Sequence, residues 1–356
     1  MILSRLLAHW QAVLPESSNH TVWAYSFPHW KWKYVRQCLA GLDVHFLSRN
    51  HNKPIPPTDT LLLWGMMPPP GFAAQNQILR MEDGFLRSVG LGADLTRPLS
   101  WVIDKNGLYY DATHPSDLET LLATSDLSAD LCQRASALRA RILELGLTKY
   151  TLPGKAWQRP ATKRRVSLVV GQVESDASLT FGAPDVRTNL CLLQAVRAAH
   201  PDSYLVYKPH PDVVARLRAS GHDEDKASDW CDEIITDSPM DTLLEQVDDV
   251  HVITSLAGFE ALLRRRPVTC YGLPFYAGWG LTEDKLPCQR RGRTLSLDAL
   301  VAASLLLYPR YFGPRGLMAP EEAVTNLGAW KQHEAGRSLP FQGIYRFFLR
   351  RIVGVR

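Results

Sequence analysis

Short apolar runs alternate with amphipathic stretches along the second half of the chain. The apolar runs have the length of buried strands, and they are Val166–Val170, Tyr204–Tyr207, Ile234–Thr236, Val250–Thr254 and Val268–Tyr271. The stretches between them carry apolar residues at helical spacing, and they are Asn189–Ala199, Met240–Val247 and Gly258–Arg264. Strands that alternate with helices predict a parallel sheet covered on both faces. Ligands of such sheets bind at the carboxyl ends of the strands.

The first half of the chain has a less regular rhythm. Its apolar runs predict strands at Thr21–Phe27, Val44–Leu47 and Thr60–Trp64. Helical spacing is found at Trp32–Leu42, Ser116–Leu122 and Leu131–Leu147. Ser116 is followed three residues later by Glu119, which is the spacing of a capping box. The turn Asn106-Gly107, between Trp101–Ile103 and Leu108–Tyr110, predicts a hairpin.

A polar segment separates the two halves. Residues 151–165 (TLPGKAWQRPATKRR) contain two prolines, one glycine and five basic residues without an apolar period, which is typical of a linker. We therefore expect an α/β fold of two Rossmann-like lobes that face a cleft. The first lobe is predicted at 1–150, the hinge at 151–165 and the second lobe at 166–310. A helical tail is expected at 311–356, returning to the first lobe or lying on a membrane surface.

Composition narrows the class of protein. The 356 residues are 46% hydrophobic and 21% charged, with a net charge of +4, as in a globular protein of two lobes. The basic residues are dispersed and do not alternate with stacking aromatics, so no nucleic-acid partner is expected. The six cysteines form no CxxC pair, which favours reduced thiols in the cytoplasm.

The terminal segments raise the question of membrane contact. Met1–Leu14 is apolar but interrupted by Arg5 and His9, which favours a short amphipathic helix over a signal peptide. No segment approaches the roughly 18 apolar residues of a membrane span. Phe341–Arg356 is aromatic and basic, so it either lies on anionic lipid or packs back on the first lobe.

Acidic residues in two motifs are candidates for catalysis. Glu82 and Asp83 precede a glycine, in an expected loop, and either one could act as general base toward an acceptor hydroxyl. The alternative is a solvated turn. Asp176, in the loop GQVESDAS after a predicted strand, could be a nucleophile or could stabilise an oxocarbenium-like centre. Alternatively, Asp176 or Ser178 caps a helix. Gln172 and Ser178 of this loop are expected to contact substrate.

Two further motifs suit a nucleotide phosphate. In Lys208-Pro209-His210-Pro211 the prolines fix the backbone, so Lys208 supplies charge and His210 a donor that could also protonate the leaving phosphate. Ser255 and the following helix amides could hold phosphate, with Glu260 on the ribose hydroxyls. The competing interpretations are a structural histidine and ordinary capping by Ser255, with Glu260 near the positive end of the helix dipole.

A glycine- and aromatic-rich loop completes the candidate site. Tyr271–Thr282 suits close backbone approach to a ligand and a wall for a base or sugar, with Tyr276 and the nearby Gly258 as contacts. A packed loop between the lobes is the alternative. The sequence has no GxxxxGK[ST], HExxH or GxSxG motif and no DxD pair at a strand end. We therefore expect a nucleotide-sugar enzyme that uses neither a metal nor a cofactor.

In their order, these motifs resemble the capsule polysaccharide synthesis family, specifically the β-Kdo transferase modules of the KpsC type. The resemblance extends from about Trp64 to Tyr311 and rests on EDGFLRSVGLG, PLSWVIDKNGLYYDATHPSDLE, GQVESDAS, YKPHPDV and TSLAGFEALLRRRPVTCYGLPFYAGWGLT. It implies a GT-B fold, a CMP-Kdo donor, in which Kdo is an eight-carbon acidic sugar, and transfer with retention. The His-Pro pair and the following serine are similar to the CMP-binding motifs of bacterial sialyltransferases.

The resemblance also implies roles for individual residues. Four of them would hold CMP: Lys208, His210, Ser255 and Glu260. Asp176 would be the covalent nucleophile of a double displacement, although Glu174 stands two residues away. Glu82 or Asp83 would serve the acceptor.

One departure from the family pattern concerns the number of modules. Family members often carry two modules, whereas each motif occurs once here, so we expect one linkage type. The acceptor is left open between a lipid-linked first sugar, a growing Kdo oligomer and another glycan. Expected partners are the inner-membrane surface and the proteins of capsule assembly and export. The alternative functions are transfer of another CMP-nonulosonic acid, such as a sialic acid, and a non-catalytic scaffold of polysaccharide assembly.

Overall fold

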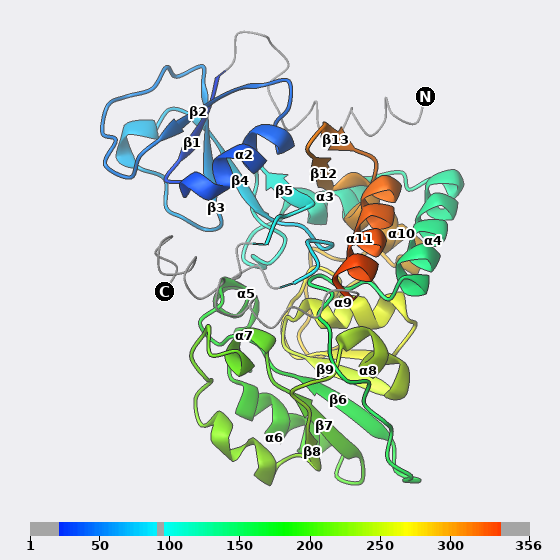
Figure 1. Ribbon diagram of the computed structural model, residues 1–356. Coiled ribbons are helices and arrows are strands. Elements are labelled where there is room, and N and C mark those ends of the chain that lie inside the picture. The colour runs from blue at the N-terminus through cyan, green and yellow to red at the C-terminus, as the bar shows by residue number, and fades with distance from the viewer. Residues whose placement is uncertain (1–20, 91–95, 336–356) are drawn as a thin grey trace.

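Two separate sheets organise the protein, whose computed structural model describes residues 21–90 and 96–335 (Figure 1). The first sheet has seven strands in the order β13-β12-β5-β4-β3-β1-β2, and the second has six in the order β11-β10-β9-β6-β7-β8. We call the part built on each sheet the first and the second lobe. This arrangement confirms the expected fold class of two α/β lobes.

The first sheet is mixed. Its strands are β1 (Thr21–Tyr25), β2 (Asp43–Leu47), β3 (Thr60–Trp64), β4 (Gln77–Asp83), β5 (Ser100–Asp104), β12 (Pro309–Gly313) and β13 (Gly316–Met318). Strands β1 to β4 pair in parallel, whereas β5, β12 and β13 pair antiparallel. Leu61, Leu62 and Leu63 of β3 are fully buried, because helices and loops cover both faces of a central strand.

The helices of the first lobe come from both ends of the described chain. They are α2 (His29–Cys38), α3 (Asp117–Thr124), α4 (Ala129–Glu144), α10 (Leu297–Val301), continued by a π-helical segment at Ala302–Leu307, and α11 (Pro320–Ala335). The predicted cap of α3 is confirmed, because the Ser116 hydroxyl accepts from the Glu119 amide at 3.0 Å. Helix α2 begins three residues before the predicted start.

The second sheet is wholly parallel, and five of its six strands overlap predicted strands, whereas β11 was not predicted. It contains β6 (Val166–Val170), β7 (Tyr204–Lys208), β8 (Glu233–Ile234), β9 (Asp249–Val252), β10 (Val268–Cys270) and β11 (Glu283–Asp284). Its helices are α5 (Ala177–Gly182), α6 (Asn189–Ala199), α7 (Pro211–Val214), α8 (Met240–Gln246) and α9 (Leu256–Leu263). All five residues of β6 are buried, as expected for a continuous apolar run in a parallel sheet.

The predicted hairpin after Trp101 is wrong. Strand β5 pairs with β4 and β12, and Leu108–Tyr110 form a turn. The Asp104 carboxylate accepts hydrogen bonds from the amides of Asn106 and Gly107, at 2.9 and 2.7 Å. These bonds fold the chain back on β5, and a bond from the Asp117 amide to the same carboxylate leads it into α3.

The C-terminal part is not the purely helical tail that the sequence predicts. Strands β12 and β13 join the first sheet before α11 begins, and every residue of β12 is buried. The short run PRYFG was missed because neither its length nor its alternation marks a strand. The terminal helices predicted at Met1–Leu14 and Phe341–Arg356 lie outside the described residues. Within the described ranges, no helix is long and apolar enough to span a membrane.

The linker segment contains no helix or strand and is fastened to the second lobe. The Lys155 amide donates to the Asp237 carbonyl at 3.0 Å, and the Trp157 indole donates to Glu233 at 2.9 Å. Its role as a hinge, and the predicted domain boundaries, stay predictions.

Candidate active site

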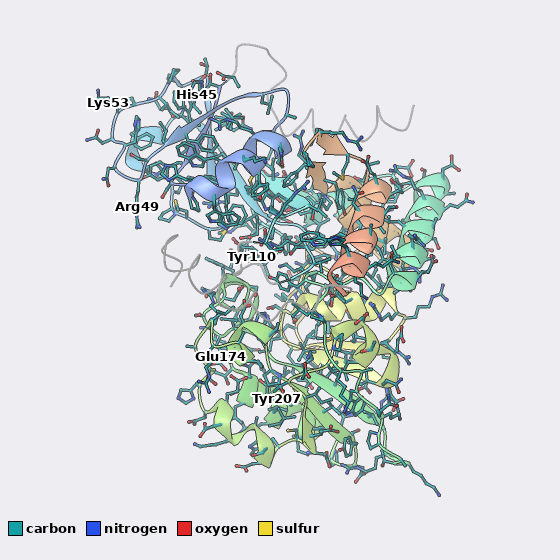
Figure 2. All side chains as sticks on the ribbon, in the orientation of Figure 1. His45, Arg49, Lys53, Tyr110, Glu174 and Tyr207 are labelled. Atoms are coloured by element: carbon teal, nitrogen blue, oxygen red, sulfur yellow. The ribbon has the colours of Figure 1, made fainter. Side chains whose placement is uncertain are left out.

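A cavity of about 410 Å³ lies between the two lobes and receives side chains from both. Ten of the twelve predicted site residues line it: Glu82, Asp83, Gln172, Asp176, Ser178, Lys208, His210, Pro211, Ser255 and Glu260. The structure therefore brings together residues that are up to 178 positions apart in the chain. Figure 2 shows Tyr110, another lining residue, where the two lobes meet.

Strand ends deliver most of these side chains. Glu82 and Asp83 are the last residues of β4, paired with β5, and not members of a loop as predicted. Lys208 ends β7, Gln172 follows β6 by two residues, and Ser255 follows β9 by three. The sites of open α/β sheets lie at such carboxyl ends.

Glu82 has the properties of an acid–base group. Burial and the neighbouring charge of Asp83 raise the pKa of Glu82 to about 7. The Tyr110 hydroxyl donates to Glu82 Oε2 at 3.3 Å. A carboxyl group that titrates near neutral pH can accept a proton from a hydroxyl and release it again.

Asp83 is held in its ionised form. Burial favours a raised pKa for Asp83, but the positive charges of Arg87, Lys31 and Lys149 hold the pKa of Asp83 below its ordinary value. Arg87 Nε donates to one oxygen at 2.8 Å, and the Trp101 indole donates to the other at 3.0 Å. Both Glu82 oxygens also accept hydrogen bonds, from the Asp83 amide at 2.9 Å and the Tyr110 hydroxyl at 3.3 Å. Of the two carboxylates, however, Asp83 is the one ion-paired with an arginine, Arg87, and this favours Glu82 as the base toward an acceptor.

Asp176 combines the two roles that the sequence left open. It caps α5, with Oδ1 accepting from the Ser178 amide at 2.8 Å, and it also lines the cavity. Among the described residues, no hydrogen bond to its Oδ2 is found. Capping fixes the carboxylate at the cavity wall without using its second oxygen.

Glu174, the alternative nucleophile, is occupied elsewhere. Its two oxygens accept from the amides of Asn189 and His222 at 2.8 and 2.7 Å. Glu174 does not line the cavity, and Figure 2 shows it within the second lobe, away from Tyr110. The geometry therefore favours Asp176.

His210 is a neutral hydrogen-bond donor. Burial lowers the pKa of His210 to about 4. Its Nδ1 accepts from the Asp212 amide at 3.1 Å, so the neutral ring carries its proton on Nε2. At neutral pH the ring can therefore donate a hydrogen bond to phosphate from Nε2, but it is not already protonated as a general acid would be.

The remaining phosphate candidates are positioned by local hydrogen bonds. Burial lowers the pKa of Lys208, whose Nζ donates to the Ser238 carbonyl at 2.7 Å. The Ser255 hydroxyl caps α9 by accepting from the Ala257 amide at 3.3 Å. The Gly258 amide donates to the Ser255 carbonyl at 3.1 Å, so the Leu256 amide is the one in the first turn of α9 that stays available to an anion.

Gln172 joins two strand ends of the second sheet. Its Oε1 accepts from the Thr254 amide at 2.8 Å and its Nε2 donates to the Thr254 hydroxyl at 3.0 Å. Gln172 thus fixes the floor of the cavity, and a contact of its own with substrate stays a prediction.

Two predicted contacts, Gly258 and Tyr276, lie outside the cavity lining. The Tyr276 hydroxyl donates to the Ser255 carbonyl. A Cβ at Gly258 would collide with the Tyr276 ring. Both residues therefore pack against the start of α9 and do not line the cavity. For Tyr276 this agrees with the alternative that its loop is packed between other segments.

Lys149, Tyr109 and Tyr110 were missed by sequence reasoning, whereas Phe275 belongs to the loop that was predicted to form a wall. Lys149, Tyr109, Tyr110 and Phe275 line the cavity. The tyrosine pair was visible within a family motif, but Lys149 lies between a helix and a linker, where no local pattern marks it. Its amide donates to Glu260 Oε1 at 2.7 Å, which occupies one of the oxygens expected to bind ribose.

The described residues also bear on metal binding. Between residues 21–90 and 96–335, no group of three or more His, Cys, Asp or Glu side chains is arranged to hold a metal ion. Metal independence stays a prediction.

Comparison with known proteins places the chain in a family. The family model described as capsule polysaccharide biosynthesis protein matches residues 61–151 and 154–311. The capsule polysaccharide modification protein LipA of Neisseria meningitidis serogroup A is 46% identical over 246 residues, covering 68% of this chain and 35% of LipA. The lipopolysaccharide-processing protein LpsZ of Rhizobium meliloti is 44% identical over 260 residues, covering 71% of this chain and 59% of LpsZ. The chain thus spans about a third of the length of LipA.

Two solved structures are similar over nearly their whole length. KpsC of Thermosulfurimonas dismutans, β-Kdo 2,7 transferase, has a TM-score of 0.72 and 36% identity, with 87% of this chain and 99% of that chain covered. KpsC of the same organism, β-Kdo 2,4 transferase, has a TM-score of 0.74 and 30% identity, with 86% and 97% covered. These matches confirm the GT-B-like fold class. The family model and these relatives show that the chain belongs to the capsule polysaccharide biosynthesis family.

Proposed function

We propose that this chain transfers Kdo from CMP-Kdo to a glycan or glycolipid acceptor, with retention, during synthesis of a bacterial surface polysaccharide. The observation that carries the proposal is the cavity between the lobes. It collects an acid–base carboxyl group from the first lobe and a capped carboxylate and phosphate-binding groups from the second. Its volume of about 410 Å³ lies in the range of small-ligand sites. The two similar KpsC structures are those of β-Kdo transferases, which supports Kdo as the sugar.

The second lobe would bind the nucleotide. Lys208, the Nε2–H of His210 and the Leu256 amide at the start of α9 surround the strand ends where a phosphate would lie. An arriving phosphate raises the pKa of both Lys208 and His210, because a nearby negative charge favours their protonated forms. We propose that these groups balance the phosphate charge without a metal ion or a cofactor.

The first half-reaction would form a covalent intermediate. The Asp176 carboxylate attacks C2 of Kdo, the bond from C2 to the phosphate oxygen breaks, and CMP leaves with the electron pair. His210 and Lys208 stabilise the phosphate that departs. The sugar is then an ester of Asp176 with inverted configuration.

The second half-reaction would deliver the sugar. The acceptor hydroxyl attacks C2 from the face that CMP has left, and its proton passes to the ionised Glu82. The bond from C2 to Asp176 breaks and restores the carboxylate. Two inversions give net retention, as in retaining glycosidases.

We further propose that the acceptor is attached to or grows at the inner-membrane surface, next to proteins of capsule assembly and export. The family description and the names of the relatives support a role in the synthesis of a capsule or lipopolysaccharide. The identity of the acceptor and the linkage position stay predictions.

A donor comparison tests the proposal against its alternatives. CMP release is measured with CMP-Kdo and with CMP-sialic acid, using a short synthetic Kdo oligosaccharide as the acceptor. We expect release from CMP-Kdo to be at least about a hundredfold faster, because buried polar groups reject a sugar of the wrong shape. Faster release from CMP-sialic acid would establish the other-sugar alternative. Release from neither donor would leave the scaffold alternative.

A further inference from the structure

Lys149 is fixed at the point where the chain passes from the first lobe to the second. Its amide donates to Glu260 of α9 at 2.7 Å, and its carbonyl accepts from the amides of Arg87 and Ser88 at 3.1 and 3.2 Å. The main chain of Lys149 is thus held by both lobes. Its side chain lines the cavity between them.

The charge of Lys149 reaches reacting groups on both sides of the cavity. Its positive charge counteracts the rise that burial imposes on the pKa values of Glu82 and Asp83 in the first lobe, and it adds to the lowering of the pKa of His210 in the second. Burial favours a lowered pKa for Lys149 itself, but Tyr150 and the surrounding acidic groups hold it well above its ordinary value. The ammonium group is therefore charged at neutral pH.

The ammonium of Lys149 is available to a ligand, unlike that of the other lysine in the cavity wall. Lys208 Nζ donates to the Ser238 carbonyl at 2.7 Å. For Lys149 Nζ, no hydrogen bond to any described residue is found, and the Tyr150 ring centroid lies 5.3 Å away. A charged group in the wall of a cavity, without a hydrogen-bonding partner among the described residues, suits an anionic ligand.

The proposed donor supplies such an anion at the reacting carbon. A 2-keto acid sugar carries its carboxylate on C1, directly attached to the C2 that Asp176 attacks. Two carboxylates that approach each other repel strongly in a site sheltered from water, and a fixed cation between them offsets the repulsion. Glu82 and Asp83 add to the negative charge around the donor.

We propose that Lys149 binds the carboxylate of the donor sugar and thereby makes the cavity selective for 2-keto acid sugars. This inference rests on the proposed function, because it takes C2 of the donor to lie at Asp176. A neutral sugar would leave the ammonium without a partner, which disfavours its binding.

The test compares the acid with its neutral ester. Binding of free Kdo and of its C1 methyl ester is measured by ligand-observed NMR in the presence of saturating CMP. The proteins are the wild type, Lys149→Gln and the control Lys155→Gln, which removes an exposed charge from the linker. The glutamine keeps both main-chain contacts of position 149. Calorimetry with CMP alone reports on the nucleotide site and on folding.

We expect the wild type and Lys155→Gln to bind Kdo about tenfold or more tightly than the ester, as for a hydrogen bond between charged groups. Lys149→Gln should bind both equally and keep its CMP affinity. A preference for the acid that survives in Lys149→Gln would overturn the inference alone. Parallel loss of CMP binding would also overturn it, since Lys149 would then support the fold. A wild type that binds neither compound and releases no CMP from CMP-Kdo would overturn the proposed function as well.

Discussion

The two carboxyl groups at the end of β4 differ in their contacts although they are adjacent in sequence. Asp83 receives hydrogen bonds from the Arg87 guanidinium and the Trp101 indole at 2.8 and 3.0 Å, whereas Glu82 accepts from the Asp83 amide at 2.9 Å and the Tyr110 hydroxyl at 3.3 Å. A carboxylate paired with arginine stays ionised, and one without a cationic partner takes up a proton more readily when it is buried. The two environments thus keep Asp83 ionised and leave Glu82 able to act as a base.

This difference predicts the pH dependence of transfer. Glu82, with a pKa of about 7, is protonated below that pH and then cannot accept the acceptor proton. We expect kcat/KM for transfer to rise with pH through about 7 in the wild type. Glu82→Gln should lower transfer by about 10²- to 10⁴-fold and abolish the rise. The measurement is CMP release in the presence of acceptor between pH 5.5 and 8.5.

Asp83→Asn provides the comparison. It should keep the rise with pH even though its rate falls, because Glu82 remains. A rise that persists in Glu82→Gln and disappears in Asp83→Asn would exchange the two roles.

At the scale of elements, the sequence predicted best the bounds of strands that are buried along their whole length and of helices that begin with a capping residue. Strands β3 and β6 have the predicted bounds, because an unbroken apolar run of five residues fits a strand buried on both faces. Helix α6 also has its predicted bounds, since the Thr188 hydroxyl caps it by accepting from the Cys191 amide at 3.1 Å. Strand β4 was missed because it ends in polar residues, and β12 because it is short. Pairing within the sheet, and not the local sequence, makes these segments strands.

A buried charge cluster between elements was also beyond sequence reasoning. Glu119 of α3 does not turn back to its cap, as a capping box requires, but binds Arg290 and Arg291 at 2.8 and 3.0 Å. Arg291 also donates to the carbonyls of Pro274 and Ala277 at 2.5 and 3.0 Å. This cluster ties α3 to the loop that supplies part of the cavity wall.

The cluster predicts a large loss of stability for Glu119→Ala. The side chains of Glu119 and Arg291 are 7% and 2% exposed, so removing the carboxylate leaves a buried guanidinium unpaired. We expect the free energy of unfolding to fall by about 3–5 kcal/mol in urea titrations.

Glu322→Ala is the matched control. Glu322 pairs with Arg315, whose side chain is 91% exposed, and such surface pairs contribute at most about 1 kcal/mol. Equal losses in the two variants would show that the Glu119 cluster is not a stabilising link.

At the scale of the whole molecule, the site exists only because the two lobes meet. The sequence could place each motif at a strand end, and ten predicted residues do line one cavity. It could not place Lys149, nor exclude Gly258 and Tyr276 from the lining, because contacts between distant segments leave no local pattern. The return of β12 to the first sheet is a feature of the same kind.

The chain also carries each motif once and spans about a third of the length of LipA. The one candidate nucleophile in the cavity between the lobes predicts one type of linkage for this cavity. The covalent step at Asp176 is the central claim, because the retention of configuration and the role of Lys149 both depend on it.

The most direct measurement is the intact mass of the protein after mixing with freshly generated CMP-Kdo, for the wild type and for Asp176→Asn. Asparagine caps a helix as well as aspartate does, so α5 is preserved while the nucleophile is lost. We predict a gain of one Kdo residue on the wild type and none on Asp176→Asn, with CMP affinities within a few-fold. An adduct on Asp176→Asn, or none on a wild type that still releases CMP to acceptor, would contradict the covalent role of Asp176.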